Sequence, residues 1–155
     1  MLRKLKIYID TSVIGGCLDD EFEEISNLLI NKFRKGEMIA MVSELTILEV
    51  RNAPQKVRAV LKSIPEENIA HVELNEEAVS LAKRYIAEGV INEGKLVDAE
   101  HIAIATIHSA DILVSWNFKH IVNLQRIHGY NSVNLKNGYP IMEIRSPREV
   151  VEYEE

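Results

Sequence analysis

The sequence predicts an α/β fold in which a central, mainly parallel sheet of four to five strands is flanked by helices. Short apolar runs alternate along the chain with segments of helical periodicity, which is the pattern of βαβ units. The strands are continuous apolar runs, as expected of parallel strands that are buried on both faces. Because βαβ crossovers are right-handed, we expect helices on both faces of the sheet and therefore a three-layer sandwich.

The chain begins with two expected strands separated by a helix. Lys6–Asp10 is short and contains β-branched and aromatic residues, which is typical of a buried strand. Glu21–Lys35 carries apolar residues at three- and four-residue spacing, and Gly36 follows it where a glycine commonly ends a helix. Met38–Val42 is a second continuous apolar run and is expected to form the second strand.

Two short helices and a third strand are expected next. Ser43 is placed to cap a helix that runs through Glu49, until Asn52-Ala53-Pro54 breaks it. Gln55–Ser63 forms a further short helix before the next proline. Ile69–Leu74 is then the third strand, because it is again a short apolar run.

The second half of the chain continues the alternation. Asn75 is a suitable N-cap for a helix at Glu76–Glu88. Val97–Ser109 has little polar surface, so we expect a helix that packs on more than one side. Ile112–Ser115 is the fourth strand. The remaining expected elements are a helix at His120–His128 that ends at Gly129, a strand at Ile141–Ile144 and a helix at Pro147–Tyr153 that begins with proline.

The length and composition of the chain limit its class. With 155 residues it can bury a core of its own, and we expect residues 1–155 to form a single domain. No apolar run approaches the roughly 18–20 residues of a membrane span, and no signal peptide is indicated. Cys17 is the single cysteine, which favours a reducing cytoplasm. The net charge of −6 is unfavourable for binding nucleic acid, although a bound metal ion adds positive charge locally.

Three acidic residues lie beside segments that are otherwise apolar. Asp10 ends the first strand, Glu49 lies on the helix after the second, and Asp98 opens the apolar helix before the fourth. Ligands bind at the carboxyl ends of parallel strands, and buried carboxylates need a compensating partner such as Mg²⁺. The three acids therefore predict a metal site. Taken singly, each has another interpretation: a turn cap, a surface ion pair and a helix N-cap, respectively.

The residues after the fourth strand lie at the same edge of the expected sheet. Ser115 and Asn117 are placed to orient water or a metal ion, although asparagine is also a common turn residue. Trp116 and Phe118 flank Asn117 and are candidates for stacking on bases if they are exposed, or for packing in the core. We expect Glu100, a further acid of the apolar helix, to face solvent.

Four blocks of the chain resemble, in order, the motif blocks of the PIN-domain family, and within it the VapC-type toxin ribonucleases of prokaryotic toxin–antitoxin pairs. The blocks are residues 7–12 (IYIDTS), 43–49 (SELTILE), 98–105 (DAEHIAIA) and 111–117 (DILVSWN). The resemblance covers nearly the whole chain. It implies a PIN-like fold and an endoribonuclease that hydrolyses RNA phosphodiesters with a water activated by Mg²⁺ or Mn²⁺.

The resemblance also assigns roles to residues. Asp10, Glu49 and Asp98 match the first three catalytic, metal-binding acids of the family, and Asn117 stands where many members carry a fourth acid. Because asparagine brings no negative charge, we expect weaker occupancy of a second metal or a one-metal mechanism. The small hydroxyl positions that help to hold the site correspond to Thr11, Ser12 and Ser115.

Partners follow from the same resemblance: RNA as substrate, an antitoxin protein and a second copy of the chain, with no membrane. The candidate RNA contacts are Arg51, Arg58, Lys119 and His120; the other histidines are expected to be core or surface residues. An antitoxin helix would bind beside the helices at Glu21–Lys35 and Gln55–Ser63.

Two other functions compete with this interpretation. The first is a catalytically weak PIN-like domain that binds RNA or protein without cutting it, which Asn117 and the acidic charge favour. The second is a nucleotide-binding module. It is disfavoured because the chain has neither a Gly-x-Gly-x-x-Gly motif nor a Walker-type loop.

Overall fold

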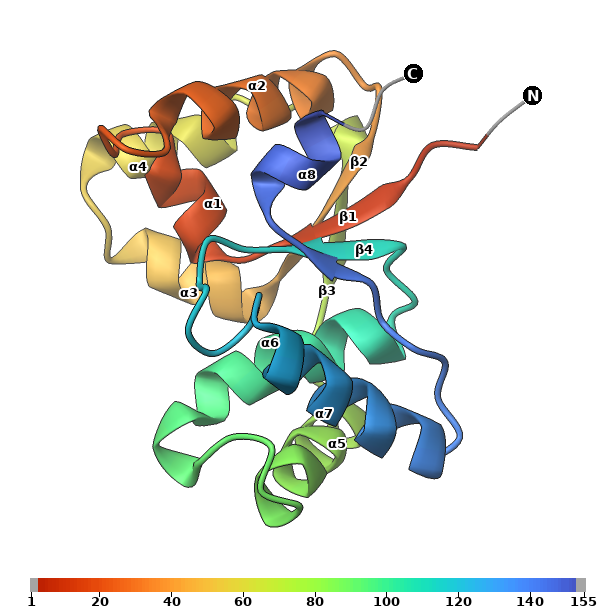
Figure 1. Ribbon diagram of the computed structural model, residues 1–155. Coiled ribbons are helices and arrows are strands. Elements are labelled where there is room, and N and C mark those ends of the chain that lie inside the picture. The colour runs from red at the N-terminus through yellow and green to blue at the C-terminus, as the bar shows by residue number, and fades with distance from the viewer. Residues whose placement is uncertain (1–2, 153–155) are drawn as a thin grey trace.

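A computed structural model describes residues 3–152, in which five parallel strands form one sheet of order β3-β2-β1-β4-β5 (Figure 1). The strands are β1 (Lys6–Ile9), β2 (Ile39–Ser43), β3 (Ile69–Val72), β4 (Ile112–Val114) and β5 (Ile144–Arg145). β1 is central, and its Tyr8 lies opposite Met41 of β2 and Leu113 of β4. The predicted α/β class with a mainly parallel sheet of four to five strands is confirmed.

Helices cover both faces of the sheet (Figure 1). One face carries α1 (Thr11–Gly16), α2 (Glu23–Arg34), α4 (Gln55–Lys62) and α8 (Pro147–Val151), with α3 (Glu44–Arg51) leading from β2 into α4. The other face carries α5 (Glu76–Ala87), α6 (Leu96–Ile107) and α7 (Leu124–Lys136). Two short 3₁₀ turns lie at Glu66–Asn68 and Glu93–Lys95. None of the helices within residues 3–152 is long and apolar enough to cross a membrane.

The sheet separates two hydrophobic cores. Ile7 and Ile9 of β1 point into the core formed with α1, α2 and α4, whereas Tyr8 points into the core formed with α5, α6 and α7. This alternation follows from the two-residue period of side chains along a strand. Because both faces of β1 are covered, Ile7, Tyr8 and Ile9 are fully buried, and Asp10 is the first residue beyond the strand.

Several local signals act as the sequence predicts. The Ser43 hydroxyl accepts a hydrogen bond from the backbone N–H of Thr46 and so caps α3. The Asn75 side chain accepts from Ala78 N–H and caps α5. Gly36 follows α2 with a φ of +74°, a left-handed conformation that favours glycine.

The prediction of a helix at His120–His128 that ends at Gly129 is wrong. The helix α7 begins after its cap, Asn123, and runs through Gly129 to Lys136. Gly129 allows a close approach, because a Cβ there would lie 2.7 Å from Val90 Cγ1. Glycine therefore serves helix packing at this position and does not end the helix.

The predicted strand at Ile141–Ile144 overlaps the observed one only at its last residue. Asn131 of α7 accepts a hydrogen bond from Met142 N–H at 2.7 Å and donates one to Met142 O at 3.1 Å. These bonds hold Met142 against α7, and the strand therefore begins only at Ile144. The C-terminal helix is confirmed from Pro147 to Val151, and the predicted end at Tyr153 lies outside the described residues.

Two further differences concern helices. The sequence analysis assigned only a turn after Asp10, where the structure has the six-residue helix α1. Glu100 was expected to face solvent, but it is buried, and burial raises the pKa of its carboxyl. The apolar helix α6 is packed on several sides, as predicted, and this packing encloses Glu100 as well.

Candidate active site

The carboxyl ends of β1, β2 and β4 lie at the same edge of the sheet. β2 and β3 lie on one side of the central strand β1, and β4 and β5 lie on the other side. Such a reversal of strand order opens a crevice beside the central strand. Asp10 follows β1, and Ser115 follows β4 at this edge. We call the group Asp10, Glu49 and Asp98 the acid edge.

Asp10 is buried and accepts hydrogen bonds on both carboxylate oxygens. Ser12 Oγ donates to Oδ1 at 2.6 Å, and Ser115 Oγ donates to Oδ2 at 2.7 Å. The two hydroxyls come from α1 and from the end of β4, so they hold the carboxylate from two sides. The predicted neighbourhood of Asp10, Ser12 and Ser115 is present in the structure.

The loop after β4 is tied to α1. Trp116 N–H donates to Ser12 Oγ at 3.0 Å, and the Trp116 indole N–H donates to Ser26 Oγ of α2 at 2.8 Å. The indole stacks on Phe22 with ring centroids 4.1 Å apart and is only 8% exposed. Trp116 is therefore a core residue, whereas Phe118 is 49% exposed and its ring is accessible for stacking on a nucleobase.

Glu49 projects from α3 and is bound through one oxygen. Thr11 Oγ1 donates to Oε1 at 2.5 Å, and His101 Nε2 lies 3.5 Å from the same oxygen. The imidazole of His101 lowers the pKa of Glu49 below its ordinary value; burial opposes this change and the Thr11 hydroxyl adds to it. Thr11 thus contacts Glu49; its supporting role in a metal site stays a prediction.

His101 is a site residue that sequence reasoning missed. It was assigned to the core or surface because no zinc-like spacing surrounds it. It lies three residues after Asp98 on α6, a spacing that places both side chains on one helix face. Its Nδ1 lies 2.6 Å from the Tyr8 hydroxyl, which lies 2.8 Å from Ser43 Oγ. The spacing from Asp98 was the available signal.

Asp98 is half-buried, and no side chain or backbone group among residues 3–152 gives its carboxylate a hydrogen bond. Burial raises its pKa, and the negative charge of Asp10 adds to this rise, whereas His101 and His120 oppose it. The alternative role as an N-cap does not apply, because Lys95 occupies the N-cap of α6. Among the described residues, Asp98 therefore has no hydrogen-bond partner, and it lies within electrostatic range of Asp10.

Asn117 shapes the turn after β4. Its Oδ1 accepts from Lys119 N–H at 3.2 Å and from His120 N–H at 2.9 Å. The turn alternative considered from the sequence thus describes the observed bonding. His120 is buried, and its Nδ1 has no hydrogen-bond partner among the described residues. Burial lowers the pKa of His120, and nearby Asp98 opposes this shift.

The remaining candidate RNA contacts differ in their accessibility. Arg51 is exposed at the end of α3, and Lys119 is exposed in the turn beside the acid edge. Arg58 Nη1 donates to Ala53 O at 2.5 Å, so this guanidinium already helps to hold the start of α4. Among these candidates, Arg51 and Lys119 are thus the exposed cations.

The acid edge offers carboxylate oxygens, which are the ligands that a divalent cation such as Mg²⁺ prefers. No three His, Cys, Asp or Glu side chains within residues 3–152 lie close enough together to form a metal site. The donor chemistry is nevertheless suitable: among the described residues, Asp98 has no hydrogen bond and Glu49 is engaged through Oε1 alone. Mg²⁺ is usually held by one or two carboxylates plus waters, which this set can provide.

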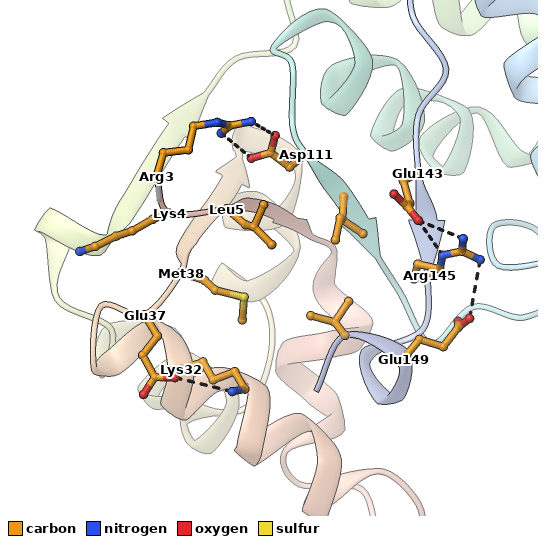
Figure 2. A pocket seen from close by; sticks show the side chains of 12 residues that line it. Arg3, Lys4, Leu5, Lys32, Glu37, Met38, Asp111, Glu143, Arg145 and Glu149 are labelled. Atoms are coloured by element: carbon orange, nitrogen blue, oxygen red, sulfur yellow. Dashed lines mark hydrogen bonds and ion pairs between the residues drawn. The ribbon is translucent and has the colours of Figure 1, made fainter. Parts of the chain in front are cut away.

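A pocket of about 740 Å³ lies at the other edge of the sheet, near the amino ends of β1, β2, β4 and β5 (Figure 2). Leu5 and Met38 contribute to its apolar wall. Its charged side chains form the ion pairs Arg3–Asp111, Lys32–Glu37, Arg145–Glu143 and Arg145–Glu149. Its acids already form ion pairs, whereas Asp98 forms none with the residues that the structure describes.

Comparisons with known proteins agree on the fold. No family model matches the chain, and no curated protein matches it. Among solved structures, FitAcB from Neisseria gonorrhoeae is similar with a TM-score of 0.58 and 14% identity, covering 92% of this chain and 98% of that one. VapBC2 from Rickettsia felis, bound to a promoter DNA fragment, gives 0.56 and 9%, with coverage of 92% and 98%.

A third similar structure is VapC20 from Mycobacterium tuberculosis, described as a Sarcin-Ricin loop cleaving toxin. It has a TM-score of 0.55 and 13% identity, and covers 73% of this chain and 91% of that one. At such identities the likeness concerns the fold. The structural neighbours of this chain over most of its length are VapC and FitB PIN-domain toxins, and its five-stranded parallel sheet flanked by helices is the PIN-domain fold.

Proposed function

We propose that this chain is a metal-dependent endoribonuclease of the PIN/VapC type that hydrolyses RNA phosphodiesters. The observation that carries the proposal is the acid edge: Asp10, Glu49 and Asp98 come from distant parts of the sequence and lie around the carboxyl end of the central strand. The fold shared with a toxin that cleaves the Sarcin-Ricin loop supports it.

Mg²⁺ or Mn²⁺ would be held by the carboxylates of Asp10, Glu49 and Asp98. When bound, the cation lowers the pKa of a water and stabilises negative charge on the phosphate. Asn117 Oδ1 already accepts two backbone N–H groups. The proposed ion therefore depends on the three carboxylates, in line with a one-metal mechanism.

The residues around the acid edge have separate tasks. Ser12 and Ser115 orient Asp10 through their hydroxyl hydrogen bonds. The Asp98 carboxylate, which accepts no hydrogen bond from the described residues, would hold the ion and orient the attacking water. Lys119 and Arg51 are exposed and would bind RNA phosphates, with Arg58 and His120 as further candidates.

We also propose an antitoxin partner and a homodimer. The similar Klebsiella pneumoniae and Rickettsia felis structures are described as toxin–antitoxin and VapBC assemblies. For this chain, an antitoxin helix would bind along α2 and α4, within the predicted Glu21–Lys35 and Gln55–Ser63. Residues 1–155 would act as one domain in the cytoplasm. Co-expression with the product of a neighbouring small reading frame, followed by light scattering, tests both partners.

The decisive experiment is RNA cleavage by the purified chain with Mg²⁺, Mn²⁺ or EDTA. Wild type is expected to cut single-stranded RNA only with a divalent cation, and Asp10→Asn is expected to lose this activity. Asp20→Asn is the matched control, because it removes the same charge from an exposed position outside the acid edge. Equal cleavage by wild type and Asp10→Asn would contradict the proposal.

A catalytically weak PIN-like domain that binds RNA or protein is the second candidate. The observation that favours it is the pairing of Asn117 Oδ1 with the turn, together with the lack of a three-ligand cluster within residues 3–152. Titration with Mg²⁺ and Mn²⁺ separates the two functions. Absence of binding at millimolar concentration would support this weaker domain over the nuclease.

A further inference from the structure

His101 links the acid edge to the centre of the sheet. We propose that His101 is a positioning residue that holds the Glu49 carboxylate in the acid edge, and that Tyr8 fixes His101 in turn. This inference rests on the proposed function, because Glu49 matters there as a metal-binding acid. From the sequence, His101 was expected to be a core or surface residue, and Tyr8 was expected to be part of a buried strand.

The contact with His101 anchors a Glu49 side chain that is otherwise largely open to solvent. The Glu49 side chain is 44% exposed, whereas that of His101 is 4% exposed. Both His101 Nε2 and Thr11 Oγ1 approach Oε1, at 3.5 and 2.5 Å. Oε2 has no hydrogen bond among the described residues, so the carboxylate is held at one oxygen and open at the other.

Tyr8 holds the other side of the His101 ring. Its hydroxyl lies 2.6 Å from Nδ1 and donates to Ser43 Oγ, and the two rings meet edge to face with centroids 5.7 Å apart. Tyr8 lies on the central strand and is fully buried. Because a rigid strand holds Tyr8 and Tyr8 holds the ring, His101 has one orientation in which Nε2 faces Glu49.

The helix α6 combines two tasks on one face. Asp98 and His101 are three residues apart, so one turn presents a proposed metal ligand and the residue that orients another ligand. Both ring nitrogens of His101 have partners, unlike His120, whose Nδ1 has none among the described residues. Groups that orient metal ligands typically change metal affinity 10–100-fold when they are removed.

The test measures Mn²⁺ affinity in a double-mutant cycle of His101→Leu and Glu49→Gln. His101→Leu is expected to weaken Mn²⁺ binding about 10–100-fold in the wild-type background. In the Glu49→Gln background it is expected to change affinity less than about 3-fold, because the oriented group is gone. Equal losses in both backgrounds would mean that His101 acts by stabilising the fold, and would overturn the proposal.

Tyr8→Phe is a second variant with a matched control. It removes the hydroxyl beside His101 and is expected to weaken Mn²⁺ binding in the same direction as His101→Leu. Tyr85→Phe removes an equally buried hydroxyl, bonded to Asn134 Oδ1 at 2.6 Å away from the acid edge. It is expected to leave Mn²⁺ affinity unchanged, and equal effects of the two variants would count against positioning.

A metal-free measurement separates the two proposals. The ¹⁵N resonances of the His101 imidazole, identified by their loss in His101→Gln, are expected to shift on Glu49→Gln and Tyr8→Phe but not on Tyr85→Phe. If they shift while wild type binds no Mn²⁺, the positioning contact holds and the metal-dependent function fails. If Glu49→Gln leaves the resonances unchanged, the positioning proposal is overturned whatever the Mn²⁺ result.

Discussion

Two adjacent glycines of α1 provide a sharp test of how the acid edge is assembled. A Cβ added at Gly16 would lie 2.5 Å from Ser26 Oγ and 2.8 Å from Trp116 Nε1, the two atoms that form a buried hydrogen bond. A Cβ added at Gly15 would meet nothing within 4 Å. Gly16→Ala and Gly15→Ala therefore add the same methyl group to neighbouring positions of one helix, with opposite surroundings.

The expected magnitudes follow from these contacts. Overpacking of a core costs about 1–3 kcal/mol, and disruption of the Ser26–Trp116 hydrogen bond costs about 1 kcal/mol more. Replacing a helical glycine by alanine returns about 0.5–1 kcal/mol. We therefore expect Gly16→Ala to destabilise the fold by about 1–3 kcal/mol, and Gly15→Ala to stabilise it by at most about 1 kcal/mol.

Thermal unfolding followed by circular dichroism measures both effects. For a chain of this size 1 kcal/mol corresponds to about 2–4 °C, so Gly16→Ala is expected to lower Tm by about 2–12 °C. Gly15→Ala is expected to raise Tm or leave it unchanged. Since Trp116 N–H also bonds Ser12, Gly16→Ala should reduce cleavage as well. A Tm for Gly16→Ala equal to or above that of Gly15→Ala would refute the reasoning.

Three further predictions concern other parts of the fold. Gly129→Ala is expected to lower Tm, because the added Cβ would lie 2.7 Å from Val90 Cγ1, and Val90→Ala in the same chain should restore part of the loss. Arg3 lowers the pKa of Asp111. The stabilisation by this ion pair is therefore complete above the ordinary Asp pKa of about 3.9. It is lost as the pH falls through the lowered pKa of the folded state. Urea unfolding of wild type and Arg3→Gln should therefore differ at pH 7 and converge in acid. Burial raises the pKa of Asp98, which means that the folded state disfavours its charged carboxylate. Asp98→Asn removes this charge and is therefore expected to raise the Tm of the metal-free protein.

Each of these three has a distinct contrary result. An unchanged Tm for Gly129→Ala would mean that α7 and the Val90 loop are less tightly packed than the structure indicates. A stability difference between wild type and Arg3→Gln that persists at low pH would exclude the ion pair as its cause. A lower metal-free Tm for Asp98→Asn would mean that the Asp98 carboxylate stabilises the fold.

Much of the fold was predictable because its signals are local. The apolar runs of the first four strands, the caps Ser43 and Asn75, and Gly36 after α2 are all recognised from residues a few positions apart. Gly129 was misassigned because the same residue type ends helices and permits close packing. Only the contact with Val90 distinguishes these two roles.

The sequence indicated which residues lie at the candidate site better than it indicated their hydrogen-bond partners. Asp10 and Ser115 were expected at one edge because the carboxyl ends of neighbouring parallel strands meet there, and they bond across 105 positions of sequence. His101 was missed because its spacing from Asp98 shows only that the two side chains share a helix face; its partners Glu49 and Tyr8 lie on other elements. Asn117 was expected at the site; its backbone N–H donates to Ser115 Oγ, and its role as a ligand stays a prediction.

The sequence by itself determined the α/β class, the order of the elements and the acids at their ends, because these depend on periodicity and on neighbours a few residues away. The tertiary structure decided which side chains compensate those acids. Thr11 reaches Glu49 across 38 positions, and Tyr8 reaches His101 across 93. Such pairs form only when the sheet brings separate elements together, so their energies are invisible to any local pattern.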